Sequence, residues 1–137
     1  MGKSDQKGDH AVESVVDVER PIKVSAWIKG FESESHAFSI LAPDYSWEKG
    51  YSIVLGAWGK KFNIFGGKIR DMGGEDDPPK NKWRHVTIEA GTEGKVSYKV
   101  EDDKGAELYN KEFEDKTYTK GKIRFLPVFV GMEVCCI

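Results

Sequence analysis

The chain has 137 residues, of which 39% are hydrophobic and 12% aromatic, and its formal net charge is −2. This length gives room for one domain with one hydrophobic core, which excludes a multidomain enzyme, and the apolar content is enough to exclude a wholly disordered chain. The balance of 21 basic and 23 acidic residues argues against nucleic acid as a partner, because a phosphate-binding surface is usually strongly basic.

The two ends of the chain give separate expectations. Residues 1–11 are polar and contain no apolar run typical of a signal peptide, so they predict a disordered tail before a single domain over residues 12–137. The protein is expected in the cytoplasm if Met1 is native, and outside the cell if an export signal has been removed. Cys135 and Cys136 are adjacent, so they can form a vicinal disulfide, pair between chains or stay reduced.

Short segments of alternating apolar and polar residues fill the chain, and helical periodicity is nearly absent. In residues 22–28 the apolar side chains share one face, and Lys23, Ser25 and Trp27 share the other. The remaining predicted strands are residues 12–19, 36–42, 51–58, 61–65, 83–90, 95–101, 107–113, 121–126 and 128–137. This spacing of strands and turns is typical of an antiparallel β-sandwich or barrel.

Clusters of Gly, Pro, Asp and Asn predict the connections between these strands. Residues 59–60 are expected to form a tight turn and residues 102–105 a hairpin turn. Residues 71–81 are expected to be a loop, since two prolines, two glycines and four acidic residues fit neither helix nor strand. Oxygen-rich loops suit Ca²⁺, which makes calcium the one candidate cofactor. Its predicted ligands are Asp71, Glu75, Asp76 and Asp77.

Three segments resemble the strands of laminin-G-like and pentraxin-like domains. Residues 22–30 resemble their opening strand, residues 81–108 their later hairpin, and residues 121–137 their closing strand pair. The resemblance implies an all-β fold, an antiparallel two-sheet β-sandwich of the jelly-roll, concanavalin A-like type. Residues 36–65 also resemble the farnesoic acid methyltransferase-type β-sandwich domain, through the pattern Tyr51-x-Ile53-x-Leu55-Gly56-Ala57-Trp58.

The jelly-roll resemblance implies binding of carbohydrate or of protein surfaces. The His-x-Asn-Pro-Arg strand of galectins is absent from the sequence, as is the Glu-x-Asp-x-x-Glu strand of laminarinase-like hydrolases. No strand-to-helix glycine-rich turn for a methyl donor is present either. The resemblance therefore points to a function class without selecting a sugar.

Aromatic residues in a polar loop carry the functional prediction. Tyr45 and Trp47 stand beside Asp44 and Glu48, and Trp58 ends the next strand. Sugars stack their C–H face on an aromatic ring while polar side chains bind their hydroxyls. The alternative for Trp47 is that its ring covers the core. The predicted ligand-binding residues are Trp47, Tyr45, Trp58, Asp44, Glu48, Asn63 and Trp27.

The tryptophans in strands leave two readings open. Trp83 and Trp27 are expected to pack in the core or between the sheets. Trp27, however, shares its face with Lys23 and Ser25, so either that face is covered or Trp27 lies on a concave binding surface. His85, near Trp83 on the same strand, is expected to be a packed, hydrogen-bonded residue.

The sequence as a whole predicts a non-catalytic carbohydrate-binding, lectin-like module with a glycan as its partner. No catalytic residue is assigned, because Glu32 and Glu34 read as loop acids and the histidines form no local ligand pair. One alternative is a small polysaccharide hydrolase or lyase that uses acids on the concave sheet face. Another is a protein-interaction or assembly module, which would form a homo-oligomer through its sheet edges. No segment is apolar and long enough for a membrane span.

Overall fold

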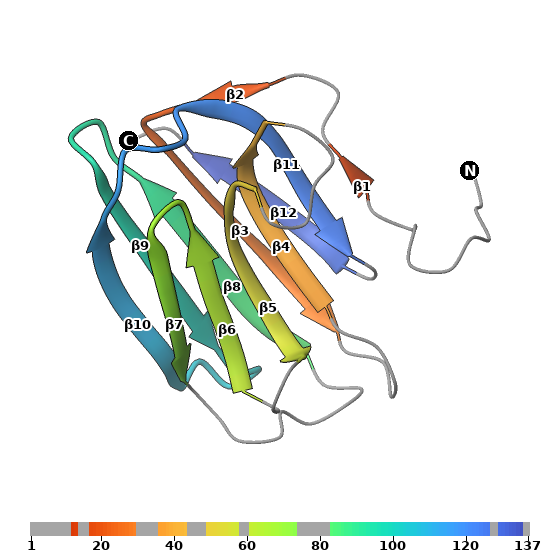
Figure 1. The fold of residues 1–137 in the computed structure, drawn as a ribbon. Helices are drawn as coiled ribbons and strands as arrows, with labels where there is room; N and C mark the ends of the chain where they lie inside the picture. Colours follow the sequence, from red (N-terminus) through yellow and green to blue (C-terminus); the bar gives the residue numbers. More distant parts are fainter. Residues whose placement is uncertain are drawn as a thin grey trace.

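The computed structural model describes residues 12–13, 17–29, 36–43, 49–57, 61–73, 83–126 and 129–135. This part of the chain contains twelve β-strands and no helix (Figure 1). The strands are β1 (Val12–Glu13), β2 (Val18–Glu19), β3 (Ile22–Lys29), β4 (His36–Ala42), β5 (Tyr51–Ala57), β6 (Lys61–Gly66), β7 (Ile69–Gly73), β8 (Trp83–Ala90), β9 (Lys95–Glu101), β10 (Glu107–Glu114), β11 (Lys120–Leu126) and β12 (Phe129–Cys135). No helix in the described ranges has the length and apolar character needed to cross a membrane. The predicted tail, residues 1–11, lies outside the described residues.

The strands form two antiparallel sheets that face each other in two layers (Figure 1). The seven-stranded sheet has the order β1-β11-β4-β5-β6-β7, and β2 also pairs with β11. The five-stranded sheet has the order β10-β9-β8-β3-β12. This arrangement confirms the predicted all-β, two-sheet sandwich and decides against a barrel.

Side chains that alternate along the strands build one core between the sheets. Strand β8 alternates between half-buried and buried residues over its whole length, and β3 does the same between Lys23 and Ile28 except at the buried Ser25. The rings of Phe38 and Phe125 stack across β4 and β11, with centroids 4.9 Å apart. Each fully buried large apolar side chain contributes about 1.5–3 kcal/mol to folding, so this interlayer packing holds the sheets together.

The hairpin between β6 and β7 corrects the predicted loop over residues 71–81. Residues 71–73 belong to β7, while residues 74–81 lie outside the described residues. Gly67 turns the chain with φ of 58°, and a Cβ there would lie 2.4 Å from Asp115 Oδ1. The chain can therefore reverse and close against Asp115 only with glycine at this position. Composition hid the strand, because its last residues read as part of an acidic, glycine-rich loop.

Two other predicted segments have different outcomes. The hairpin turn at residues 102–105 is confirmed, since Asp102 Oδ1 accepts hydrogen bonds from Lys104 N at 2.8 Å and Ala106 N at 2.9 Å. Gly105 has φ of 87°, which suits glycine. The strand predicted over residues 12–19 is instead the two short strands β1 and β2, both paired with β11. The tight turn predicted at residues 59–60 lies outside the described residues.

A buried polar cluster ties the sheets together at one end, and we name it the Arg20 cluster after its central residue. Arg20 donates to the Tyr51 hydroxyl at 2.6 Å and to Gly91 O at 3.0 Å. The Tyr51 hydroxyl donates to Asp115 Oδ1 at 2.8 Å. Burial raises the pKa of Tyr51 to about 12. Burial alone would raise the pKa of Asp115, but hydrogen bonds from Lys68 N, Thr117 N and the Tyr51 hydroxyl lower it below its usual value.

Candidate functional site

Most residues of the predicted aromatic site cannot be placed. Asp44, Tyr45, Trp47, Glu48 and Trp58 lie outside the described residues. The structure places only Asn63 and Trp27 of that set, and it does not bring them together. Asn63 is on β6 of the seven-stranded sheet, whereas Trp27 is on β3 of the five-stranded sheet.

Asn63 lies on the outer face of the seven-stranded sheet. Pairing aligns it with Val54 of β5 and Met72 of β7, and Val54 in turn with Ala37 of β4. Ala37 and Val54 form a small apolar cluster with Phe65, separate from the main core. Asn63 is only 7% exposed and Val54 1%, whereas Met72 is 51% exposed. Accessible surface next to Asn63 is therefore found at Met72 on β7, whereas Asn63 itself and Val54 on β5 are buried.

The outer face of the five-stranded sheet has a different composition. Alternation places polar side chains outward on β3, β8, β9 and β10, and the strand register aligns them in three rows across the sheet. The first row is Lys23, Glu89, Ser97 and Glu112; the second is Ser25, Thr87, Lys99 and Asn110; the third is Trp27, His85 and Glu101. Residues from four strands therefore meet on one surface.

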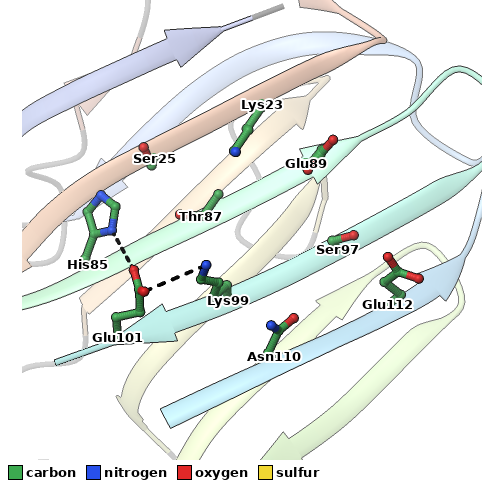
Figure 2. Close-up of a pocket in the computed structure, with 10 residues that line it drawn as sticks. All are labelled: Lys23, Ser25, His85, Thr87, Glu89, Ser97, Lys99, Glu101, Asn110 and Glu112. Carbon is green, nitrogen blue, oxygen red and sulfur yellow. Dashed lines mark hydrogen bonds and ion pairs between the residues drawn. The ribbon is translucent and has the colours of Figure 1, made fainter. Parts of the chain in front are cut away.

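These rows line a hollow of about 470 Å³ on the sheet, which we name the polar groove (Figure 2). Its lining consists of every residue in the three rows except Trp27. The lining side chains are two lysines, three glutamates, one histidine, three hydroxyl residues and one asparagine. The groove thus presents both donors and acceptors of hydrogen bonds over a polar surface.

At one end of the groove His85 is held between two neighbours. Its Nδ1 lies 3.1 Å from Glu101 Oε1, and Lys99 Nζ lies 3.7 Å from Glu101 Oε2 (Figure 2). The ring of Trp27 contacts the His85 ring with a centroid distance of 4.9 Å and an interplanar angle of 38°. His85 and Glu101 are each 24% exposed, so this corner is partly shielded and well ordered by contacts.

The core positions expected for the two tryptophans are wrong. Trp83 and Trp27 both point to the outer face, because they alternate with inward residues such as Ala26 and Val86. Both side chains are half-buried. Trp27 does share an outer polar face with Lys23 and Ser25, which was the alternative prediction from the sequence. Its ring, however, packs on His85 beside the groove. The expectation of a hydrogen-bonded His85 is confirmed.

From its β3 end to β9 the groove carries polar groups that hold no hydrogen bond to another described residue. These are the ammonium of Lys23, the carboxylate of Glu89, and three hydroxyls. The hydroxyls belong to Ser25, Thr87 and Ser97. A ligand that reaches this part of the groove meets polar groups without first breaking a bond between described side chains, which lowers the cost of binding.

Asp71, the one described residue of the predicted calcium site, already has partners. The Tyr109 hydroxyl donates to its Oδ2, and Lys111 Nζ lies 3.1 Å from the same atom. Burial alone would raise the pKa of Asp71, but these two hydrogen bonds lower it below its usual value. Within the described ranges no group of three or more metal-ligating side chains gathers. Glu75, Asp76 and Asp77 lie outside them, so the calcium site stays a prediction.

Comparison with known proteins supports the fold. No protein-family model matches the chain, and no curated protein matches it either. A toad ovary galectin in complex with thio-digalactose has a TM-score of 0.63 and 9% identity, with 93% of this chain and 100% of the galectin covered. The same galectin in complex with N-acetylgalactose has a TM-score of 0.63 and 10% identity, with 95% of this chain and 100% of the galectin covered. A Parabacteroides distasonis protein provisionally named as a glycosyl hydrolase has a TM-score of 0.67 and 11% identity, with 96% of this chain and 85% of that protein covered.

At these identities the likeness concerns the fold, which is the jelly-roll β-sandwich of galectins. It agrees with the concanavalin A-like jelly roll that the sequence resemblance implied. The comparisons give no support to the resemblance of residues 36–65 to the farnesoic acid methyltransferase-type domain.

Proposed function

We propose that this protein is a non-catalytic carbohydrate-binding module that holds a glycan in the polar groove of the five-stranded sheet. The polar groove itself carries the proposal, because it offers carboxylate, ammonium, amide and hydroxyl groups on one accessible surface. A sugar presents several hydroxyls, each of which donates and accepts hydrogen bonds, and such a ligand matches a mixed lining of this kind. A groove of one charge would favour ions instead.

The galectin complexes support carbohydrate as the class of ligand, and they do not identify the sugar. The toad galectin binds thio-digalactose and N-acetylgalactose on the same fold. This chain lacks the His-x-Asn-Pro-Arg strand of galectins and is only about a tenth identical to them. The sugar that binds here is therefore to be found by experiment and is not transferred from those proteins.

The aromatic loop is a second contact region in this proposal. Tyr45, Trp47 and Trp58 would supply stacking faces, and Asp44 and Glu48 would bind hydroxyls. This part of the proposal comes from the sequence and has a separate test. Trp47→Ala should lower the affinity for the glycan if the ring is a ligand contact, and should leave it unchanged if the ring only covers the core.

Glu89 supplies the test of the groove. A glycan array with the full chain should give at least one hit, and Glu89→Gln should lower the affinity for that glycan about fivefold, since a hydrogen bond to a charged acceptor is stronger by about 1 kcal/mol than one to a neutral acceptor. Glu93→Gln is the matched control, because Glu93 is exposed and lies outside the groove. An array without hits, or equal affinity in Glu89→Gln and wild type, would refute the proposal.

Polysaccharide hydrolysis is the second candidate, favoured by the three glutamates in the groove. Acid-catalysed cleavage of a glycosidic bond needs two carboxyl groups on either side of it. Glu101 is paired with both His85 and Lys99. Among the described side chains Glu112 is paired with Lys95 alone and Glu89 with none, so Glu89 and Glu112 are the two carboxyl groups to test. A reducing-end assay on a polysaccharide that binds should show no turnover if the module is non-catalytic. Turnover that disappears in Glu89→Gln would make the protein a hydrolase.

Calcium is kept in the proposal as a candidate at the acidic loop. A cation that binds only the folded protein must raise its melting temperature. Melting curves with calcium and with EDTA therefore test the site, and Asp71→Asn shows whether Asp71 takes part.

A further inference from the structure

The length of the polar groove follows from the number of strands that line it. The row formed by Lys23, Glu89, Ser97 and Glu112 crosses four neighbouring strands, from β3 through β8 and β9 to β10. Strands in a sheet lie about 4.8 Å apart, so three spacings give about 14 Å from the first strand to the last. That length exceeds what one sugar ring of a glycan fills.

The width follows from the spacing of residues along a strand. The second row starts at Ser25 and ends at Asn110, two residues along β3 and β10 from the first row. Residues two apart on a strand are separated by about 6.8 Å. The first two rows, which cross all four strands, therefore border a slot that is about twice as long as it is wide, at right angles to the strands (Figure 2). The third row adds His85 and Glu101 to the lining and widens the groove over β8 and β9.

The chemistry repeats along this slot, because each strand contributes one polar side chain to each row. Strand β8, for example, supplies Glu89 and Thr87, and β10 supplies Glu112 and Asn110. A single sugar would contact the pairs of two neighbouring strands and leave the rest to water. A chain of sugars would place hydroxyls against each pair in turn, since its hydroxyls repeat as well.

The charges along the slot favour a neutral chain. The lining holds three glutamates against two lysines, and one of these lysines, Lys99, pairs with Glu101. At the β10 end Glu112 lies 3.9 Å from Lys95, whereas Asn110 donates to Glu107 at 2.9 Å. With Lys95 beside Glu112, the three glutamates face three lysines, so a polyanionic glycan gains no net attraction here and has to approach the carboxylates.

We infer that the polar groove takes a neutral, linear oligosaccharide of about three units, which crosses the strands and ends against Asn110 and Glu112. This inference rests on the proposed function and names its ligand class. The sugar at the β3 end meets Lys23 and Ser25, and the sugar over β8 and β9 meets the central side chains. The third sugar alone reaches β10.

Oligosaccharides of increasing length test the inference. Linear galacto-, manno-, cello- and laminari-oligosaccharides of one to five units, together with the matching oligouronates, are titrated into the full chain by calorimetry. In the series that binds, affinity should rise about tenfold or more from one unit to three. It should rise by less than about twofold from three units to five, because the described residues that line the groove come from β3, β8, β9 and β10 alone.

Variants at the β10 end locate the third unit. Asn110 and Glu112 are exposed, so Asn110→Ala and Glu112→Ala should fold normally. Each should lower the affinity for the three-unit ligand about fivefold and leave the two-unit ligand unchanged. Glu114→Ala is the matched control, because Glu114 is exposed on the same strand and outside the groove. Melting curves confirm that all three variants are folded.

The outcomes separate this inference from the proposed function. Equal affinity for one and three units, tighter binding of oligouronates, or no effect of the β10 variants would overturn the oligosaccharide inference while glycan binding stands. If no carbohydrate of any length binds and the array is also empty, both fall together.

Discussion

The outer faces of the two sheets obey the same alternation and yet have opposite character. On the seven-stranded sheet, Ala37, Val54 and Phe65 form an apolar cluster, and the neighbouring Ser39 and Ser52 hydrogen-bond each other at 2.8 Å while both are buried. On the five-stranded sheet the corresponding positions hold charged and hydroxyl side chains that line a hollow.

The difference shows that alternation assigns residues to a face but does not decide whether that face is accessible. In the seven-stranded sheet the small and apolar side chains suit a surface that is shielded from water. In the five-stranded sheet the polar rows suit a surface in contact with water or with a polar ligand. The proposed glycan binding is placed on the second face for this reason, and variants on the two faces test the contrast.

The largest effect on stability is expected from a charged residue placed on the outer face of the seven-stranded sheet. Val54 is 1% exposed, and Val54→Asp would bury a carboxylate in an apolar cluster, which should lower the free energy of unfolding by about 4 kcal/mol or prevent folding. Thr87→Asp on the open face should change it by less than about 0.5 kcal/mol. Urea denaturation measures both. Similar small changes in the two variants would mean that the outer face of the seven-stranded sheet is open as well.

A substitution in the Arg20 cluster is expected to lower the free energy of unfolding by less than the introduction of a buried charge at Val54. Asp115 accepts hydrogen bonds from Tyr51, Lys68 N and Thr117 N, so Asp115→Asn should lower the free energy of unfolding at pH 7 by about 2 kcal/mol. Glu101→Gln, in the half-exposed corner of the groove, should lower it by less than about 1 kcal/mol.

The pH dependence of stability gives a second test of Asp115. The pKa of Asp115 is lower in the folded protein than in the unfolded chain, so its contribution is complete above about pH 4 and is lost as the pH falls through the folded value. Asp115→Asn should therefore lose less stability than the wild type between pH 4 and pH 2, measured by urea denaturation. An unchanged slope in the variant would show that Asp115 does not carry this dependence.

Local patterns were sufficient to predict an all-β chain and most of its strands, whereas the choice of a jelly-roll sandwich over a barrel came from the family resemblance. The alternation in residues 22–28 and 95–101 identified β3 and β9, and Asp102 with Gly105 identified the turn after β9. Strand β7 was missed because it has only five residues and ends in a sequence that reads as loop. Residues 69–73 form a strand because they pair with β6 after the turn at Gly67, and amino-acid composition does not predict this pairing.

The polar groove could not be predicted in the same way. Its residues come from β3 and, more than fifty residues later, from the consecutive strands β8, β9 and β10, and only the register of these four strands places Lys23 near Glu89 and Lys99 near Asn110. The usable signal was the polar residues at alternate positions of these strands, of which only the face of Lys23, Ser25 and Trp27 was singled out from the sequence. The aromatic loop was chosen because its residues are neighbours in sequence.

The smallest effect, and the finest test of the contrast, concerns Trp27. Its ring contacts His85 beside the groove, and a pair of aromatic rings contributes about 1 kcal/mol, so Trp27→Ala should lower the free energy of unfolding by about that amount. Glycan affinity should fall only about twofold, since Trp27 acts by positioning His85 and does not line the groove. Trp27→Phe keeps a ring against His85 and should restore most of both losses. A fall in affinity of more than about tenfold, with stability unchanged, would instead make Trp27 a stacking contact of the sugar. In that case the binding surface would extend from the polar groove past His85 to Trp27, at the β3 end of the third row.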